Sequence, residues 1–431
     1  MTHHRLRSVS ALASVLGSIL IVFTALGGVS AQSAATPQPT VPSPAGPHRI
    51  VGVYSSYNIY DRGYFVTDIP ADKLTHLNYG PLSISENGQC ISSDEWADSG
   101  FMYPEDKETE RKRGNFKQLG LLKAEYPDLK IVMSVGAWEY SARFSDVAAT
   151  EEARVRFANS CISYMVTNGF DGIDIDWRYP VIGGKEGNIT RPEDGENLAL
   201  LLETLRTQLD AEAVDVGRPF LLTATLPAVP ENVDPLPLGK IQRPLDWVNI
   251  TSYGYQGDWS DLASHAAPLY PNTRDPRGEA VYSRYNVSAT VSAYLDAGVP
   301  ADKIVIGIPF YAQTWRNVRP NDYFGLYSIA DGVPNGTRPG GILYYSDLET
   351  LFGSQNYVRF FDPETSAAWM YSESQRVAIS YEDELSIKAK TDYVREMNLG
   401  GVMLNELSFD SDEATLLNNV YDNFYGSRAR N

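Results

Sequence analysis

Short runs of apolar residues recur along the whole chain, separated by longer segments whose apolar positions follow a helical spacing. The runs are continuous rather than alternating, which is typical of strands covered on both faces of a parallel sheet. We predict strands at residues 50–54, 74–79, 130–135, 172–176, 221–225, 247–251, 304–308 and 400–404. We predict helices at residues 115–126, 151–168, 194–211, 287–297, 383–397 and 412–423. This order indicates an α/β protein built as a closed (β/α)8 TIM barrel.

The interval between the seventh and eighth strands breaks this pattern. Residues 315–379 form a segment too long for one crossover, rich in Tyr, Phe, Gly and Pro and poor in helical periodicity. Strand-like pieces at residues 341–345 and 357–361 predict a small α+β insertion domain at about residues 316–380. Loops that follow barrel strands form the active-site face, so we expect this insertion to form one wall of a groove.

The N-terminal residues have the pattern of a secretory signal. A short basic start precedes the apolar residues 11–29, and small residues end the segment at Ala31. We predict cleavage after Ala31, a secreted protein and no stable membrane span; the alternative is an uncleaved anchor. Residues 32–48 are rich in Pro, Ser, Thr and Ala and predict a disordered linker. We predict that the remaining residues, 49–431, form one ordered unit.

Composition narrows the possible partners. The chain carries 36 Lys and Arg against 54 Asp and Glu, a formal net charge of −18, which argues against nucleic-acid binding. Only Cys90 and Cys161 occur, so there is no disulfide framework. Cys161 lies on the apolar face of a predicted helix, and we expect buried free thiols rather than a bridge. We expect no metal or cofactor, and a monomer.

The predicted fourth strand carries the most informative motif. In the run Asp171-Gly172-Ile173-Asp174-Ile175-Asp176-Trp177-Arg178, alternate residues share a face, so Asp174, Asp176 and Arg178 point the same way. Two carboxylates inside a barrel mouth are unfavourable unless they are neutralised or used. Spacing alone leaves a structural Asp–Arg network and a functional site equally open. In either case we predict that Arg178 pairs with Asp176, Asp174 or both.

From residue 49 to residue 425 the chain resembles glycoside hydrolase family 18, the chitinases and chitinase-like proteins. The resemblance rests on motifs in family order: Ile50-Val51-Gly52-Val53-Tyr54, Leu74-Thr75-His76-Leu77-Asn78-Tyr79, Met133-Ser134-Val135-Gly136-Ala137-Trp138, the fourth-strand run extended to Tyr179-Pro180, Ser252-Tyr253, Gly307-Ile308-Pro309-Phe310-Tyr311 followed by Trp315, and Gly400-Gly401-Val402-Met403. The family also has an insertion domain between strands seven and eight.

The resemblance implies a substrate-assisted mechanism. In the family a Glu protonates the leaving oxygen while the 2-acetamido group of the sugar attacks the anomeric carbon. Asp176 would orient that group, with Asp174 behind it and Tyr253 donating a hydrogen bond. Trp138, Tyr311 and Trp315 would contact sugar, and aromatic residues of adjoining loops could extend the groove: Tyr57, Tyr255 and Trp259.

Three departures from the family pattern fall on the position of the cleaved sugar. Arg178 stands where the family has the proton-donating Glu, Gly254 where it has an Asp, and Asn405 where it has a Trp. A guanidinium has no proton to give at neutral pH. We therefore predict a secreted, non-hydrolytic chitinase-like protein whose barrel-mouth groove, including Asn405 and Glu406, binds chitin, chitooligosaccharides or related β-linked N-acetylated glycans.

Two alternatives remain open. The protein could be an active glycosidase with a relocated acid such as Glu406, which follows Asn405 at a position that is usually Glu in the family. It could also be a scaffold whose groove is vestigial. If Arg178 is not fully occupied by the aspartates, its donors could accept a sugar carboxylate, although the acidic surface favours neutral oligomers.

Overall fold

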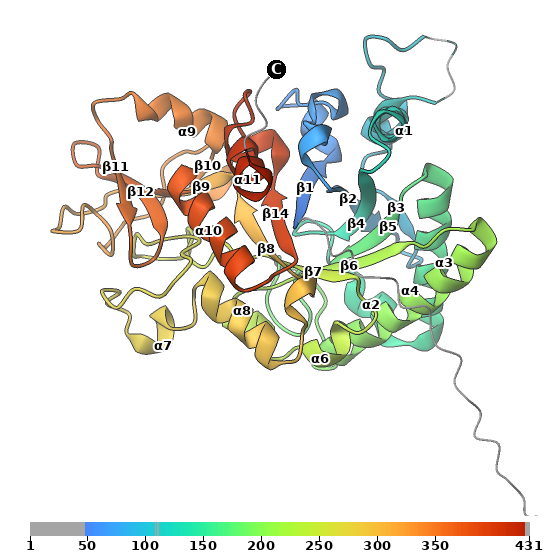
Figure 1. The fold of residues 1–431 in the computed structure, drawn as a ribbon. Coiled ribbons are helices and arrows are strands. Elements are labelled where there is room, and N and C mark those ends of the chain that lie inside the picture. Colours follow the sequence, from blue (N-terminus) through green and yellow to red (C-terminus); the bar gives the residue numbers. More distant parts are fainter. Residues whose placement is uncertain (1–47, 108, 110–111, 427–431) are drawn as a thin grey trace, which may run out of the picture. The chain divides into compact units, whose positions relative to one another are not determined.

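The computed structural model describes residues 48–107, 109 and 112–426, so the predicted signal segment and most of the predicted linker lie outside the described residues. Eight parallel strands close into a barrel (Figure 1): β1 (Arg49–Ser55), β2 (His76–Ile84), β4 (Lys130–Gly136), β5 (Gly172–Asp176), β6 (Leu221–Leu226), β7 (Trp247–Ile250), β8 (Ile304–Pro309) and β14 (Gly401–Asn405). Their order is β1-β14-β8-β7-β6-β5-β4-β2, and β2 pairs back to β1. The predicted TIM barrel is confirmed.

Strand β2 is longer than the sequence pattern predicted. It continues to Ile84, where it turns back through β3 (Cys90–Ser92) as an antiparallel hairpin. Cys90 of β3 and Cys161 are both buried and both free, as predicted.

The six predicted helices are present with small shifts at their ends: α1 (Gly114–Glu125), α3 (Glu151–Asn168), α4 (Asp194–Val216), α8 (Val287–Asp296), α10 (Glu384–Glu396) and α11 (Thr415–Tyr425). Helix α3 begins where the Thr150 hydroxyl accepts the Ala153 N–H, and it ends before Gly169 in the left-handed region. Helix α4 runs five residues past its predicted end because the first left-handed glycine is Gly217.

Shorter helical segments fill the remaining connections. The four-to-eight-residue helices are α2 (Phe144–Ala149), α5 (Pro230–Val233), α6 (Leu238–Ile241), α7 (Glu279–Tyr282) and α9 (Tyr345–Phe352). Single turns of other helix types are η1 (Ser56–Ile59), η2 (Val66–Asp68), η3 (Ala71–Lys73), η4 (Trp96–Gly100), η5 (Ala301–Lys303), η6 (Pro339–Gly341) and η7 (Leu407–Phe409).

A second sheet lies beside the barrel, between β8 and β14 in the sequence (Figure 1). Its five strands are antiparallel in the order β10-β9-β13-β12-β11: β9 (Tyr311–Trp315), β10 (Ile342–Tyr344), β11 (Val358–Asp362), β12 (Ala367–Ser372) and β13 (Val377–Tyr381). The sheet begins at Tyr311, earlier than the predicted boundary near residue 316, because β9 starts directly after Phe310 and pairs with both β10 and β13. Tyr311 and Trp315 are therefore strand residues of this sheet.

The barrel interior has an apolar layer beneath a polar one. Four strands contribute the apolar layer, which holds Val51, Trp247, Val305 and Met403. The Trp247 indole N–H donates to the Asn249 side chain at 2.9 Å and so joins the two layers. Above this bond the polar layer opens toward the carboxyl ends of the strands, which is where barrel enzymes place their sites.

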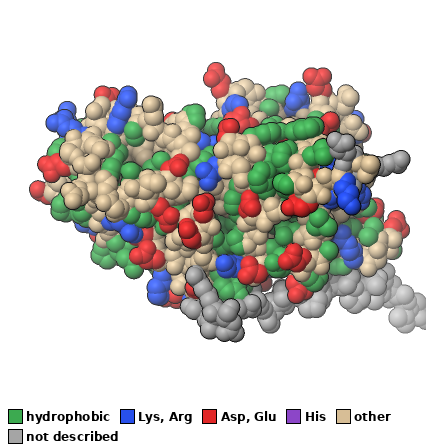
Figure 2. All heavy atoms as spheres, turned by 90° about the horizontal axis from the view of Figure 1, so that it is seen from above, with side chains coloured by type: hydrophobic (Ala, Val, Ile, Leu, Met, Phe, Trp, Pro, Cys, Tyr) green, Lys and Arg blue, Asp and Glu red, His purple; other side chains and the backbone are tan. Residues whose placement is uncertain are grey.

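Within the described residues, no helix combines the length and apolar character needed to cross a membrane. On the face drawn in Figure 2, Lys and Arg side chains are scattered singly among acidic ones rather than gathered into one field.

Candidate functional site

Arg178 and Asp176 form a two-bond ion pair just past the carboxyl end of β5. The Arg178 Nε donates to Asp176 Oδ1 at 2.6 Å, and Nη2 donates to Oδ2 at 2.7 Å. Although burial alone would lower it, the charge of Asp176 holds the pKa of Arg178 above its ordinary value. The predicted pairing with Asp176 is confirmed, and both oxygens of that carboxylate are occupied by the guanidinium.

Asp174 lies deeper in the barrel and does not contact Arg178. Its carboxylate accepts bonds from four side chains on β4, β6 and β7: Ser134 (2.8 Å), Thr223 (2.6 Å), Thr225 (3.0 Å) and Asn249 (3.2 Å). Burial, with a smaller contribution from the charge of Asp176, raises the pKa of Asp174 to about 6. Sequence reasoning missed these four partners, although each is a polar residue inside an apolar strand.

Tyr253 and Asn405 face each other across the mouth. The Asn405 Nδ2 donates to the Tyr253 hydroxyl at 2.6 Å, and Tyr253 meets the ring of Tyr311 edge to face at 6.0 Å. Burial raises the pKa of Tyr253 to about 12, so its hydroxyl stays protonated at neutral pH. The structure therefore brings Asp174, Asp176, Arg178, Tyr253, Tyr311 and Asn405 together at one end of the barrel.

Trp138 is an exposed aromatic ring beside this group. The side chain is 45% exposed and meets Tyr179, the neighbour of Arg178, edge to face at 6.4 Å. The turn that carries it is fixed by Gly136, where a Cβ would lie 2.2 Å from the Asp176 carbonyl oxygen. One face of a saccharide could stack on such a ring.

Trp315 does not provide the exposed ring that was expected of it. The side chain is 1% exposed, packs with Val318, Tyr371 and Ala378, and donates its indole N–H to the Gly257 carbonyl at 3.2 Å. Trp315 is buried because it belongs to β9, where its side chain packs against other residues of the second sheet and its connections. Tyr255 is buried as well, whereas Trp259 is largely exposed.

Glu406 is buried, and its carboxylate is fully hydrogen-bonded. Its carboxylate is 3% exposed and accepts bonds from Ser55 (2.5 Å), Asn58 (2.7 Å) and Ser408 (2.6 Å). A general acid must reach the oxygen that it protonates. In this structure both oxygens of the Glu406 carboxylate are occupied by these three donors.

The other carboxylates considered as replacement acids are either paired with a lysine or exposed in a loop. Glu139 pairs with Lys185, and Glu196 accepts from Lys240. Glu186 is exposed in the loop after β5. Within the described part of the chain, no group of three or more His, Cys, Asp and Glu side chains is placed to hold a metal ion.

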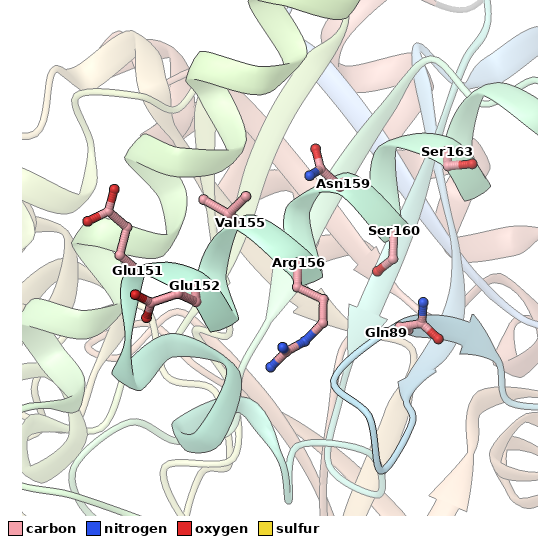
Figure 3. A pocket seen from close by; sticks show the side chains of 8 residues that line it. All are labelled: Gln89, Glu151, Glu152, Val155, Arg156, Asn159, Ser160 and Ser163. Carbon is pink, nitrogen blue, oxygen red and sulfur yellow. The ribbon is translucent and has the colours of Figure 1, made fainter. Parts of the chain in front are cut away.

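Two hollows lie on the outer flank of the barrel rather than at its mouth. One runs along α3 (Figure 3) and is lined by Gln89, Glu151, Glu152, Val155, Arg156, Asn159, Ser160 and Ser163. The other adjoins it at Arg156 and the β2–β3 turn. Their linings mix both charges and hold no aromatic ring, in contrast to the mouth, which combines hydrogen-bond donors with an exposed indole.

Comparison with curated proteins finds chitinases. The chain is 36% identical to chitinase A1 of Niallia circulans over 415 residues, covering 89% of this chain and 59% of that protein. It is 33% identical to endochitinase 1 of Metarhizium robertsii over 362 residues, covering 83% of this chain and 80% of that protein.

Comparison with solved structures gives the same result. A chitinase from Bacillus thuringiensis superposes with a TM-score of 0.83 at 31% identity, covering 90% of this chain and 71% of that one. The catalytic domain of a psychrophilic chitinase B from Arthrobacter gives 0.81 at 29% identity, covering 88% and 96%. The family model of Glycosyl hydrolases family 18 matches residues 49–410. The chain therefore belongs to glycosyl hydrolase family 18.

Proposed function

We propose that this is a secreted chitinase-like protein that binds chitin or related β-linked N-acetylated glycans at the barrel mouth without cutting them efficiently. The observation that carries the proposal is the ion pair of Arg178 and Asp176, in which two guanidinium nitrogens occupy both carboxylate oxygens. Secretion is inferred from the signal-like pattern of residues 1–31.

The Arg178–Asp176 pair affects two steps of the family mechanism: protonation of the leaving oxygen and orientation of the acetamido group. Arg178 stands where the resemblance implies a proton-donating Glu, and a guanidinium cannot donate a proton near neutral pH. Asp176, which would orient the acetamido group of the sugar, is already bonded to Arg178. General acid catalysis alone is typically worth about 10²–10⁴-fold in rate. We infer that hydrolysis is close to absent.

Binding does not depend on the missing acid. The exposed ring of Trp138 can stack on the C–H face of a sugar, and the side chains of Tyr253 and Asn405 can hydrogen-bond to hydroxyl or acetamido groups. The relatives are named as chitinases, which favours an N-acetylated, β-linked ligand. A lectin-like or accessory role is the function that these features support best.

The hydrolysis test uses a chromogenic chitooligosaccharide and the chain from residue 32 onward. We expect no turnover above background from the unmodified protein. Arg178→Glu should also fail to reach a family-typical rate, because Gly254 and Asn405 still depart from the family pattern. Robust turnover by the unmodified protein would refute the non-hydrolytic proposal and make Glu406→Gln the next variant to assay.

The binding test is calorimetric titration with neutral chitooligosaccharides. Trp138→Ala should weaken binding by about 0.5–1.5 kcal/mol beyond the lost contact area, whereas Trp138→Phe, which keeps a ring, should lose less. If Trp138→Ala binds as well as the unmodified protein, or if neither binds, the lectin-like proposal fails and a scaffold role replaces it.

A further inference from the structure

Arg338 is an exposed arginine that lies over the barrel mouth. Its guanidinium carbon is 5.7 Å from the centroid of the Tyr57 ring and 5.8 Å from that of Phe409. Tyr57 belongs to η1, which follows β1, and Phe409 belongs to η7, which follows β14. Because β1 and β14 are adjacent, Arg338 is fixed above the carboxyl ends of two neighbouring barrel strands.

No described carboxylate oxygen lies within 4.0 Å of the Arg338 guanidinium nitrogens. Glu406 acts on Arg338 through its charge, but its own oxygens accept bonds from Ser55, Asn58 and Ser408. Arg62, which lies nearby on the ring of Tyr344, instead donates to the Ser408 carbonyl and the Ser346 hydroxyl. The Arg338 guanidinium also interacts with the Tyr57 hydroxyl, but it has five N–H donors, so most of them remain open to an incoming ligand.

A row of aromatic rings connects Arg338 with the site at β5. Phe409 meets Tyr311 at 6.4 Å, and Tyr311 meets Tyr253 at 6.0 Å. Tyr253 in turn bonds to Asn405. A glycan that crosses the mouth from Trp138 along this row would bring one of its sugar units beside the Arg338 guanidinium.

We propose that Arg338 binds the carboxylate of an acidic sugar unit, so that the preferred ligand is a β-linked N-acetylated glycan in which some units carry a carboxylate. The planar guanidinium matches a carboxylate through two parallel hydrogen bonds, and the two rings beneath it restrict its orientation. This inference rests on the proposed glycan binding and adds the charge of the ligand to it.

The acidic surface of the protein does not prevent this contact. Charges that lie more than about 8 Å apart are largely screened at physiological ionic strength, so the net charge of −18 slows approach more than it weakens a direct bond. Arg178 is less suited to the role, because two of its nitrogens are already bonded to Asp176.

The test compares two disaccharides that differ in one substituent. One contains two N-acetylglucosamine units, and in the other the second unit is N-acetylmuramic acid, whose lactyl ether carries the carboxylate. We expect calorimetry to show about fivefold tighter binding of the acidic disaccharide. Its methyl ester should bind like the neutral one, and rising salt should reduce the preference.

Variants assign the preference to Arg338. Arg338→Gln should abolish it and leave binding of the neutral disaccharide unchanged, while Arg338→Lys should keep only part of it. Arg376→Gln is the matched control, since Arg376 is an exposed arginine in the turn between β12 and β13. A hyaluronan tetrasaccharide tests whether a uronate serves as well as a lactyl group, and tighter binding of either acidic ligand supports the proposal.

The outcomes separate the two proposals. Equal affinity for the neutral and acidic disaccharides would overturn the role of Arg338 and leave glycan binding intact. A preference that survives Arg338→Gln would overturn it as well. Absence of binding by every ligand would overturn glycan binding and, with it, this inference.

Discussion

Two buried ion pairs in this protein differ in what surrounds them. Arg178 and Asp176 lie at the barrel mouth with side-chain exposures of 18% and 7%. Lys390 and Glu382 lie where α10 follows the second sheet, with exposures of 0% and 3%. Glu382 also accepts the Ser386 hydroxyl at 2.7 Å, and Ser386 belongs to the N-terminal cap of α10. The first pair reaches solvent and the second does not.

The difference shows how position decides what an ion pair does. A sealed pair must satisfy its charges internally, because water cannot replace a lost partner. A pair at the mouth can exchange a protein partner for water or a ligand group. Lys390–Glu382 therefore belongs to the closed interior of the fold, whereas Arg178–Asp176 lies at the edge of the candidate site, where water or a ligand can approach it.

The largest expected loss of stability comes from disrupting the buried pair of Lys390 and Glu382. Lys390→Met leaves the Glu382 carboxyl buried without its counter-charge, and removing one partner of a buried pair typically costs about 3–5 kcal/mol. Urea denaturation should show this loss. Lys388→Met is the control on the same helix, because Lys388 is exposed and pairs with Asp392, and it should change stability by less than about 0.5 kcal/mol.

Replacing the cation of the pair at the mouth by Met should reduce the free energy of unfolding by a smaller amount. Arg178→Met leaves Asp176 without its partner, but water can solvate the carboxylate there, so we expect a loss of about 1–3 kcal/mol in urea denaturation. Lys185→Met removes an exposed pair in the loop after β5 and should be nearly neutral. If Arg178→Met destabilises the fold as much as Lys390→Met does, the proposed contrast between the pairs is wrong.

Double-mutant cycles sharpen the contrast further. Combining Arg178→Met with Asp176→Asn removes both charges, and the coupling energy should be about 1 kcal/mol. Combining Lys390→Met with Glu382→Gln should give a larger value, toward about 3 kcal/mol, because the sealed environment strengthens the interaction. Coupling energies of equal size would contradict the distinction.

The bounds of a helix or strand could be predicted from the sequence where the residues that set them lie in or next to that element. β5 and α3 were predicted with their observed bounds, because the alternation of Ile and Asp lies within β5, and the Thr150 cap and Gly169 lie directly beside α3. The pairing of Arg178 with Asp176 was predictable too, since the residues are two positions apart on one strand.

The environment of single side chains was harder to predict because distant residues determine it. Ser55 and Asn58, which saturate Glu406, lie 351 and 348 positions away in the sequence. Trp138 and Trp315 both follow barrel strands, yet one is exposed and the other is buried by strands of the second sheet. The early start of that sheet at Tyr311 places Trp315 inside it, and no local pattern indicated this.

The last expected effect is a pH dependence and concerns Asp174, the deeper carboxyl at the mouth, whose pKa is raised to about 6 chiefly by burial. The pKa of an aspartate in the unfolded chain is about 3.9, so between these values the folded state binds more protons than the unfolded one. Stability from this group is therefore full below about pH 4 and is lost as the pH rises to about 6.

Asp174→Asn stays neutral at every pH and should flatten that dependence by about 2 kcal/mol between pH 4 and 6 in urea denaturation. The amide can be accommodated, because its oxygen can face the Asn249 donor while its NH₂ faces Ser134 and Thr225, whose hydroxyls can turn to accept. Some slope should persist, since the pKa values of Asp98 and Asp410 are also raised to about 6 by burial. An unchanged slope would show that Asp174 ionises as freely as a solvated carboxylate. In that case the interior of the mouth would be as open to water as its rim, and the contrast with the sealed pair would extend to the whole polar layer of the barrel.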